Sequence, residues 1–204
     1  VAVEPILAKN NLVGNYNLDP NLNFVGLAAD GGFAKYCVLD GDLVHVIPDS
    51  LSYEQAALTE PAAVAVYAVR QSALKAGDTA AVFGLGPIGL LIVEALRAAG
   101  ASKIYAVELS PERQAKAEEL GAIVVRPEEG ETAVEAIHRL TNGGVDVSYE
   151  VTGVPVVLGQ ALAAVHKAGE CMVVSIWERE ANINPNEFAI QEKTLKGIIA
   201  YRHI

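Results

Sequence analysis

The sequence predicts an α/β fold built on a doubly wound, six-stranded parallel sheet, and two observations support this prediction. First, a short apolar run over residues 80–83 leads directly into a glycine-rich turn, and an apolar helical stretch follows the turn. Second, strand-like and helix-like segments alternate regularly over the rest of the chain. Such alternation is typical of parallel sheets whose strands are joined by helical crossovers.

Hydrophobic periodicity and turn residues delimit the individual elements. The predicted strands span residues 79–83, 103–107, 123–125, 145–150, 170–174 and 195–200. The predicted helices span residues 87–99, 111–120, 131–141, 154–165 and, as one short piece, 187–192. Ser110 is placed to cap the start of the second helix and Gly121 to close it. The expected strand order is 3-2-1-4-5-6.

The first 72 residues predict a β-rich arrangement instead. Strand-like segments occupy residues 1–3, 33–39 and 43–47, a polar loop occupies residues 9–23, and a turn lies at residues 40–42. Ser52 and Gln55 have the spacing of a capping box, and Pro61 suits the first position of a helix over residues 62–72. We therefore divide the chain into residues 1–72 and residues 73–204. Because the chain starts inside a strand and stops just after one, we expect it to be truncated at both ends.

The glycine turn itself points to dinucleotide binding. In a G-x-G-x-x-G turn, Gly84 would make the tight bend, Gly86 would let the backbone approach the phosphates, and Gly89 would let the helix pack closely. Glu108 ends the next strand about twenty residues on, where a carboxylate binds the adenosine ribose hydroxyls. A carboxylate there repels a 2′-phosphate, so NAD is favoured over NADP. The alternative is an ordinary strand–turn–helix unit with a solvated glutamate.

Composition excludes several classes of partner. The chain has 204 residues, of which 51% are hydrophobic, and a formal net charge of −10. This charge argues against nucleic acid or an anionic membrane as the main partner, and no apolar stretch approaches the length of a membrane span. Cys37 and Cys171 lie far apart in apolar, strand-like settings, so we expect two buried reduced thiols and a cytoplasmic location.

Several longer motifs resemble one known family. They are T-E-P-A-A-V-A-V-Y-A-V-R-Q-S, A-V-F-G-L-G-P-I-G-L-L, V-E-L-S-P-E-R, N-G-G-V-D-V, E-V-T-G-V-P and G-I-I-A-Y-R-H. Together they resemble the zinc-dependent medium-chain alcohol dehydrogenases, most closely the 2,3-butanediol and sorbitol dehydrogenase branch. The resemblance covers nearly the whole chain. It implies a Rossmann sheet in residues 73–204 and part of a GroES-like catalytic domain, with a connecting helix, in residues 1–72.

The resemblance also implies roles for particular residues. The pyrophosphate would be held by Gly84, Gly86, Pro87, Ile88 and Gly89, and the adenosine half by Glu108, Arg113, Thr152 and Gly153. The nicotinamide would be flanked by Val174, Ser175, Ile176, Ala200 and Tyr201, and Glu60 would lie beside a catalytic zinc. Each role has a plainer alternative: a helix-start carboxylate for Glu60, a solvated arginine for Arg113, and turn or core residues for Thr152, Gly153 and Tyr201.

The activity implied is that of an NAD-dependent, zinc-assisted dehydrogenase, which interconverts a secondary alcohol or vicinal diol and a ketone. The family's main zinc ligands lie upstream of this chain, so we expect the chain as given to bind NAD without turnover. A structural zinc is expected to be absent, because residues 8–19 contain no cysteine. His45, His138, His166 and His203 lack metal-ligand spacing and are expected to be structural or surface residues.

The family also associates through the last strand of its sheet, which implies a homodimer or homotetramer. Two alternative functions stay open. One is a non-catalytic NAD-binding module, and the other is a zinc-independent NADPH reductase of the same superfamily.

Overall fold

The computed structural model describes residues 1–8 and 14–202, which form two compact units. One contains the described residues of Val1–Val64 and Ile199–Ile204, and the other is Ala65–Ile198. The division falls inside helix α2 (Thr59–Gln71), whereas the sequence-based boundary was placed just after that helix. His203 lies outside the described residues.

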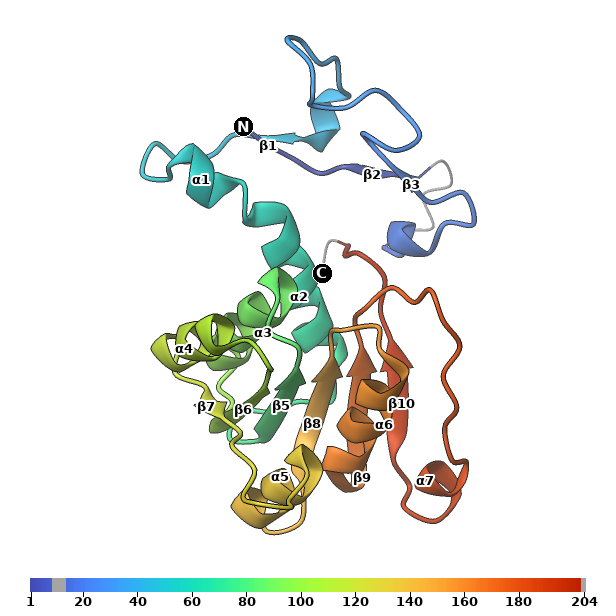
Figure 1. Cartoon of the computed structure of the whole chain (residues 1–204). Helices are drawn as coiled ribbons and strands as arrows, with labels where there is room; N and C mark the ends of the chain where they lie inside the picture. The colour runs from blue at the N-terminus through green and yellow to red at the C-terminus, as the bar shows by residue number, and fades with distance from the viewer. Residues whose placement is uncertain (9–13, 203–204) are drawn as a thin grey trace. The chain divides into compact units, whose positions relative to one another are not determined.

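The larger unit is built on a six-stranded sheet in which every neighbouring pair of strands is parallel. Its strands are β5 (Thr79–Phe83), β6 (Lys103–Val107), β7 (Ile123–Val124), β8 (Val145–Glu150), β9 (Val165–Val173) and β10 (Thr194–Gly197). Their order across the sheet is β10-β9-β8-β5-β6-β7 (Figure 1). Read from the β7 edge, this is the predicted order 3-2-1-4-5-6, and the prediction is confirmed.

Helices cover both faces of this sheet. They are α3 (Pro87–Ala98), α4 (Pro111–Glu119), α5 (Ala133–Thr141), α6 (Pro155–Ala164) and the short α7 (Asn186–Ala189). Ala80 and Val82 of β5 pack on one face with residues of α2, α3 and α4. Ala81 and Phe83 pack on the other face with residues of α5 and α6, of which α6 lies in front of the sheet in Figure 1. Alternate residues of one strand thus enter two hydrophobic cores, which explains why residues 80–83 of β5 are all apolar.

Two predicted helix ends in this unit are confirmed and several boundaries move. Ser110 caps α4 by accepting from the backbone N–H of Arg113, and Gly121 follows the helix at φ +87°. Helix α5 begins two residues later than predicted, because Thr132 and Glu135 form a capping box there. Strand β9 begins at Val165 instead of residue 170, since Val165 already pairs with Val145 of β8. Strand β10 ends at Gly197, and Ala200 has a φ of +48°, which is not an extended conformation.

The smaller unit contains only short strands among its described residues. Strand β1 (Ala2–Val3) pairs antiparallel with β4 (Val44–His45), and β2 (Ile6–Leu7) pairs with β3 (Asn23–Phe24). Two 3-10 helices, η1 (Tyr16–Leu18) and η2 (Gly41–Leu43), lie between them in the chain. Because Leu43 ends η2, the predicted strand over residues 43–47 is reduced to β4.

The predicted strand over residues 33–39 is wrong. Phe33, Tyr36 and Val38 are exposed, and no described strand pairs with this segment. A strand is stable only when its backbone groups are hydrogen-bonded to a neighbour, so local β propensity alone does not form one. Cys37 is exposed for the same reason, contrary to its predicted burial. Cys171, on β9, is buried as predicted, and burial raises the pKa of its thiol to about 12.

The start of α2 also differs from the prediction. The capping box of Ser52 and Gln55 is present at α1 (Tyr53–Ala56). Pro61, however, is the third residue of α2 and not the first. The first four N–H groups of a helix have no intrahelical acceptor, so a proline in the third position loses no hydrogen bond. Among the described residues, no helix is both long and apolar enough to cross a membrane.

Candidate functional site

The three glycines of the turn between β5 and α3 are required for different reasons. Gly84 has a φ of +92°, and a Cβ there would lie 2.5 Å from Cγ2 of Thr152. A Cβ on Gly89 would lie 2.0 Å from the carbonyl oxygen of Gly84. At Gly86, by contrast, φ is −66° and a Cβ would meet no atom of the protein within 4 Å. The fold itself explains Gly84 and Gly89, whereas Gly86 leaves open space that a ligand could approach.

The start of α3 presents backbone donors next to this space. Pro87 is the first residue of the helix, and the carbonyl of Gly86 accepts the first helical hydrogen bond, from the N–H of Leu90, at 3.0 Å. The N–H groups of Ile88 and Gly89 precede that bond and have no acceptor within the helix. A helix N-terminus of this kind stabilises a phosphate through its N–H groups and its dipole.

Glu108, just after β6, is hydrogen-bonded to the glycine turn. Its Oε2 accepts from the N–H of Leu85 at 2.8 Å, and its Oε1 accepts from the N–H groups of Leu109 (2.8 Å) and Ser110 (3.0 Å). The Arg113 guanidinium lies 3.8 Å from Oε2. Burial raises the pKa of Glu108, but the three backbone donors and Arg113 outweigh it and leave the pKa below its usual value. Glu108 is therefore a carboxylate at neutral pH.

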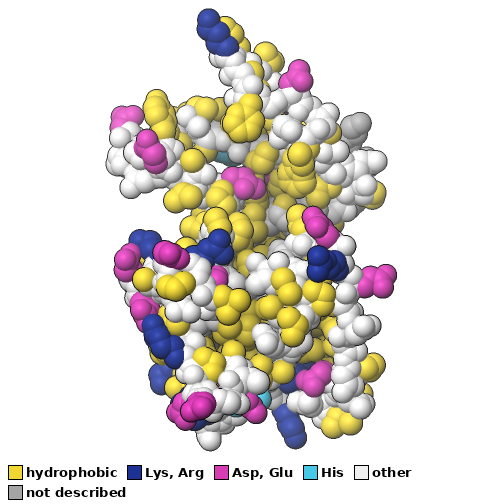
Figure 2. All heavy atoms as spheres, in the orientation of Figure 1, with side chains coloured by type: hydrophobic (Ala, Val, Ile, Leu, Met, Phe, Trp, Pro, Cys, Tyr) yellow, Lys and Arg dark blue, Asp and Glu magenta, His cyan; other side chains and the backbone are white. Residues whose placement is uncertain are grey.

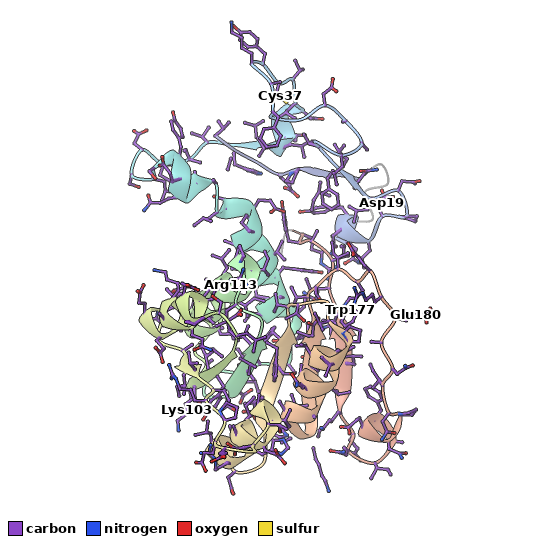
Figure 3. The ribbon with its side chains drawn as sticks, viewed as in Figure 1. Asp19, Cys37, Lys103, Arg113, Trp177 and Glu180 are labelled. Atoms are coloured by element: carbon purple, nitrogen blue, oxygen red, sulfur yellow. The ribbon has the colours of Figure 1, made fainter. Side chains whose placement is uncertain are left out.

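The other predicted residues of the larger unit lie at the same edge of the sheet. Figure 3 labels Arg113 and Trp177 at the edge where the parallel strands end, and Lys103 at the opposite edge, where β6 begins. Gly153 has a φ of +69°, and a Cβ there would lie 2.8 Å from the carbonyl oxygen of Ile176. The structure thus brings Thr152 against Gly84 and Gly153 against Ile176.

The sequence reasoning missed Glu150, the last residue of β8, whose side chain joins these segments. It is fully buried. Its Oε1 accepts from the N–H (2.7 Å) and hydroxyl (2.5 Å) of Thr152 and from the N–H of Gly153 (3.0 Å). Its Oε2 accepts from the hydroxyl of Ser175. The available signal was an acidic residue at the end of the strand predicted over residues 145–150, directly before V-T-G.

In the smaller unit, the structure brings together Glu60 and Tyr201. The Tyr201 hydroxyl donates to the Glu60 carboxylate, and the tyrosine is only 8% exposed. Burial raises the pKa of Glu60, and the hydrogen bond from Tyr201 partly offsets this. Burial, followed by the charge of Glu60, raises the pKa of Tyr201. Residues 1–8 and 14–202 contain no group of three or more His, Cys, Asp or Glu side chains that could hold a metal.

The described histidines have structural contacts. His138 Nε2 lies 2.9 Å from the carbonyl oxygen of Ala163, and His166 Nε2 lies 3.1 Å from Oδ1 of Asp146. His45 is 3.8 Å from Glu4. These contacts agree with the prediction that the three histidines are structural or surface residues.

Comparison of the sequence with known proteins places it among dehydrogenases. Residues 87–204 match the family described as zinc-binding dehydrogenase. The chain is 61% identical over 205 residues to (R,R)-butanediol dehydrogenase from Bacillus subtilis (strain 168), covering 100% of this chain and 59% of that protein. It is 39% identical over 191 residues to sorbitol dehydrogenase from the same organism, covering 92% and 54%. The chain therefore spans less than two thirds of the length of these relatives.

Solved structures agree with the sequence comparison. The crystal structure of 2R,3R-butanediol dehydrogenase from Bacillus subtilis has a TM-score of 0.92 at 61% identity, covering 99% of this chain and 58% of that one. A protein named as a zinc-binding dehydrogenase, from Sinorhizobium meliloti 1021, is bound to NADP in its crystal structure. Its TM-score is 0.91 at 30% identity, with coverages of 98% and 61%.

Proposed function

The chain belongs to the zinc-binding dehydrogenase family, and from this premise we propose that its larger unit binds NAD within an intact alcohol dehydrogenase. The proposed substrates are a secondary alcohol or vicinal diol resembling 2,3-butanediol, and the corresponding ketone, which resembles acetoin. The 61% identity to a butanediol dehydrogenase supports this substrate class.

One observation supports the dinucleotide site above the others. Gly86 has a φ that any residue adopts and open space at its Cβ position, so the fold does not itself require glycine there. The same space lies next to the N–H groups at the start of α3, which attract an anion. A pyrophosphate fits both features, because its close approach needs a residue without a side chain and its charge needs donors.

Glu108 supports NAD as the nucleotide. An ionised carboxylate at the end of β6 accepts hydrogen bonds from ribose hydroxyls and repels a 2′-phosphate. The relative from Sinorhizobium meliloti is bound to NADP, so the preference for NAD is a point to be tested in this protein. Arg113, 3.8 Å from Glu108 and half-exposed, is proposed to lie along the adenine.

The chain's own residues would bind and orient the cofactor. A nicotinamide held there would supply the acceptor for a hydride from the alcohol carbon and, in its reduced form, the hydride donor to the ketone. We assign the pyrophosphate to Gly84, Gly86, Pro87, Ile88 and Gly89, and the adenosine half to Glu108, Arg113, Thr152 and Gly153. We assign the nicotinamide half to Val174, Ser175, Ile176, Ala200 and Tyr201. The N–H of Val174 already donates to the carbonyl of Glu150 at 3.0 Å, so its carbonyl is the group left for the nicotinamide.

The proposed contribution of this chain to a zinc site is limited to one residue, Glu60. Catalytic zinc normally has three protein ligands, and the described residues of this chain do not supply such a set. Glu60 is therefore proposed as a neighbour of the metal, bound to it directly or through water, in a protein that provides the other ligands. Without them, we propose that the chain as given binds NAD and does not turn over.

The proposed partners are small molecules and a second copy of the protein. On the face in Figure 2, Lys and Arg side chains (dark blue) are scattered among Asp and Glu (magenta), which argues against nucleic acid as a partner of that face. We propose association through β10, as a homodimer or homotetramer, and a cytoplasmic location in which Cys37 and Cys171 stay reduced.

A nucleotide titration of the intact protein tests this proposal. NADH and NADPH would be added separately and binding followed by nucleotide fluorescence, with 2,3-butanediol oxidation measured before and after treatment with a zinc chelator. We expect NADH to bind at least about tenfold more tightly than NADPH and the chelator to abolish oxidation while NADH still binds. Equal affinities would overturn the assignment to NAD. Oxidation that survives complete metal removal would favour the zinc-independent reductase, and NADH binding without oxidation of any alcohol would favour the non-catalytic module.

A further inference from the structure

We propose that Glu150 is a positioning residue for the dinucleotide: its carboxylate fixes Thr152-Gly153 and Val174–Ile176 relative to the glycine turn. The inference rests on the proposed function, because these two segments are the ones assigned to the adenosine and nicotinamide halves. Glu150 itself would touch no part of the cofactor, since its side chain is fully buried.

The first support is the chemistry of the buried carboxylate. A carboxylate removed from water is tolerated only when other donors replace the water. Glu150 has four such donors, and all of them come from the two segments that flank the proposed site: three from Thr152 and Gly153 and one from Ser175. The carboxylate and the two segments therefore depend on each other for their geometry.

The second support is the route from Glu150 to the glycine turn. Thr152 donates to Oε1 through both its backbone N–H and its hydroxyl, which fixes its backbone and its χ1 rotamer together. In this rotamer, Cγ2 of Thr152 lies 2.5 Å from the position that a Cβ on Gly84 would take. The methyl group thus packs against the bend of the turn, so a change in Thr152 changes the surface on which Gly84 rests.

The third support is the connection between the two segments. Ser175 donates to Oε2, and the N–H of Val174 donates to the backbone carbonyl of Glu150 at 3.0 Å. Gly153 approaches the carbonyl of Ile176 so closely that a Cβ there would lie 2.8 Å from its oxygen. Strand β8 lies between β5 and β9 in the sheet. Glu150 therefore connects the carboxyl ends of three adjacent strands.

Glu170 provides a matched control in the same sheet. It is also a buried glutamate on a central strand, and its Oε2 accepts from the N–H of Ala73 at 2.6 Å. Glu170 lies on β9 opposite Val147, three residues before Glu150 in the register, and its hydrogen bond goes to Ala73, which is in none of the proposed cofactor segments. Removing it should destabilise the fold without moving the dinucleotide site.

The test compares Glu150→Ala, Glu150→Gln and Glu170→Ala in the intact protein, with the Kd for NADH and the Tm measured for each. Glutamine keeps an oxygen for Thr152 and Gly153 and turns an amide toward Ser175, whose hydroxyl then accepts. We expect Glu150→Ala to raise the Kd by about tenfold or more, and Glu150→Gln to stay within about threefold of wild type. Glu170→Ala should lower the Tm but leave the Kd within about twofold.

Thr152→Ser gives an independent measurement if Glu150→Ala fails to fold. It keeps the hydroxyl bond to Glu150 and removes only the methyl group against Gly84, on an exposed residue. We expect a rise of about threefold to tenfold in the Kd with little change in Tm. The inference is overturned if Thr152→Ser leaves the Kd unchanged, or if folded Glu150→Ala changes it no more than Glu170→Ala does. If wild-type protein binds no NADH, the proposed function fails and this inference fails with it.

Discussion

The carboxylate of Glu108, at the end of β6, accepts a 2.8 Å hydrogen bond from the backbone N–H of Leu85, in the middle of the glycine turn. The residue proposed to select the ribose therefore also holds the turn that is proposed to hold the pyrophosphate. A substitution at Glu108 should change both nucleotide selectivity and the shape of the turn, and the two effects are separable.

Glu108→Gln tests this double role. Glutamine has nearly the same shape but no charge, so the repulsion of a 2′-phosphate disappears and one backbone donor loses its acceptor. We expect the ratio of the NADPH and NADH dissociation constants to fall by about tenfold, and the unfolding free energy to fall by about 1 kcal/mol. Glu119→Gln is the control, because that side chain is exposed on α4, where it pairs with Lys116 and contacts no part of the glycine turn among the described residues. An unchanged ratio in Glu108→Gln would show that Glu108 does not select the cofactor.

Gly86→Ala and Gly89→Ala should separate binding from folding. A Cβ on Gly86 meets no protein atom, so Gly86→Ala should leave the Tm within about 2 °C of wild type but weaken NADH binding by about tenfold or more. A Cβ on Gly89 would lie 2.0 Å from a backbone oxygen, so Gly89→Ala should destabilise the protein by about 1–3 kcal/mol or more. Thermal unfolding and NADH titration of both variants check this. If Gly86→Ala bound NADH as tightly as wild type does, the assignment of the pyrophosphate to Gly86 would be contradicted.

The pair of His166 and Asp146 predicts a pH dependence of stability. Burial lowers the pKa of His166, but the Asp146 carboxylate and the carbonyl of Lys167 outweigh it and raise the pKa overall. Because its pKa is raised in the folded protein, protonated His166 stabilises the fold. This stabilisation is complete below the pKa of histidine in the unfolded chain, about 6.5, and is lost as pH rises through the higher pKa in the folded protein. Because the His166 side chain is 42% exposed, the loss should stay below about 1 kcal/mol.

Urea unfolding at pH 6 and pH 8 measures this loss in wild type and in His166→Gln. Wild type should lose more stability than the variant between the two pH values. Asp146 adds a separate effect at acid pH. Burial raises its pKa, but Thr79 and His166 outweigh burial and lower it, so its contribution is lost only as pH falls through the folded pKa, below about 3.9. Equal slopes between pH 6 and pH 8 in wild type and His166→Gln would contradict the assignment to His166.

Replacing Lys193 with an uncharged residue should cause a large loss of stability. Its ammonium group, on a side chain only 3% exposed, donates to the carbonyl of Leu162 at 2.9 Å and to Glu187 at 2.8 Å. Lys193→Met should cost about 2–4 kcal/mol, because both acceptors lose their donor. Lys116→Met, which breaks an exposed pair with Glu119, should cost less than about 1 kcal/mol. Similar losses in the two variants, measured by urea unfolding, would show that the buried contacts of Lys193 contribute little.

Local sequence patterns were sufficient to predict the larger unit. Most strands and helices there follow from residues close in the chain, such as Ser110 before α4, and the parallel order follows from the alternation. The start of β9 at Val165 does not, because it depends on pairing with Val145 of β8. The strand predicted over residues 33–39 failed because its formation depends on a partner strand, which no local pattern reveals. The site residues also differ in whether a local pattern reveals them. The spacing of Gly84, Gly86 and Gly89 is visible in the sequence.

The hydrogen-bond donors that meet at Glu150 were not visible in the sequence. Its four donors come from residues two to twenty-five positions away along the chain, and only the fold shows that they meet at one carboxylate. The pair of Glu60 and Tyr201 is a similar case, because the family resemblance implied a role beside a metal for one and beside a nicotinamide for the other without showing their contact.

The smaller unit is discontinuous in sequence, and this has a consequence for the order in which the protein is made. The buried amide of Asn17 donates to the carbonyl of Ile199 at 2.9 Å, across 182 residues of chain. During synthesis from the N-terminus, Asn17 leaves the ribosome well before Ile199 exists, and all of Ala65–Ile198 is made in between. The larger unit therefore has its complete sequence first, and Asn17 can form its hydrogen bond to Ile199, within the smaller unit, only after all of Ala65–Ile198 has been synthesised.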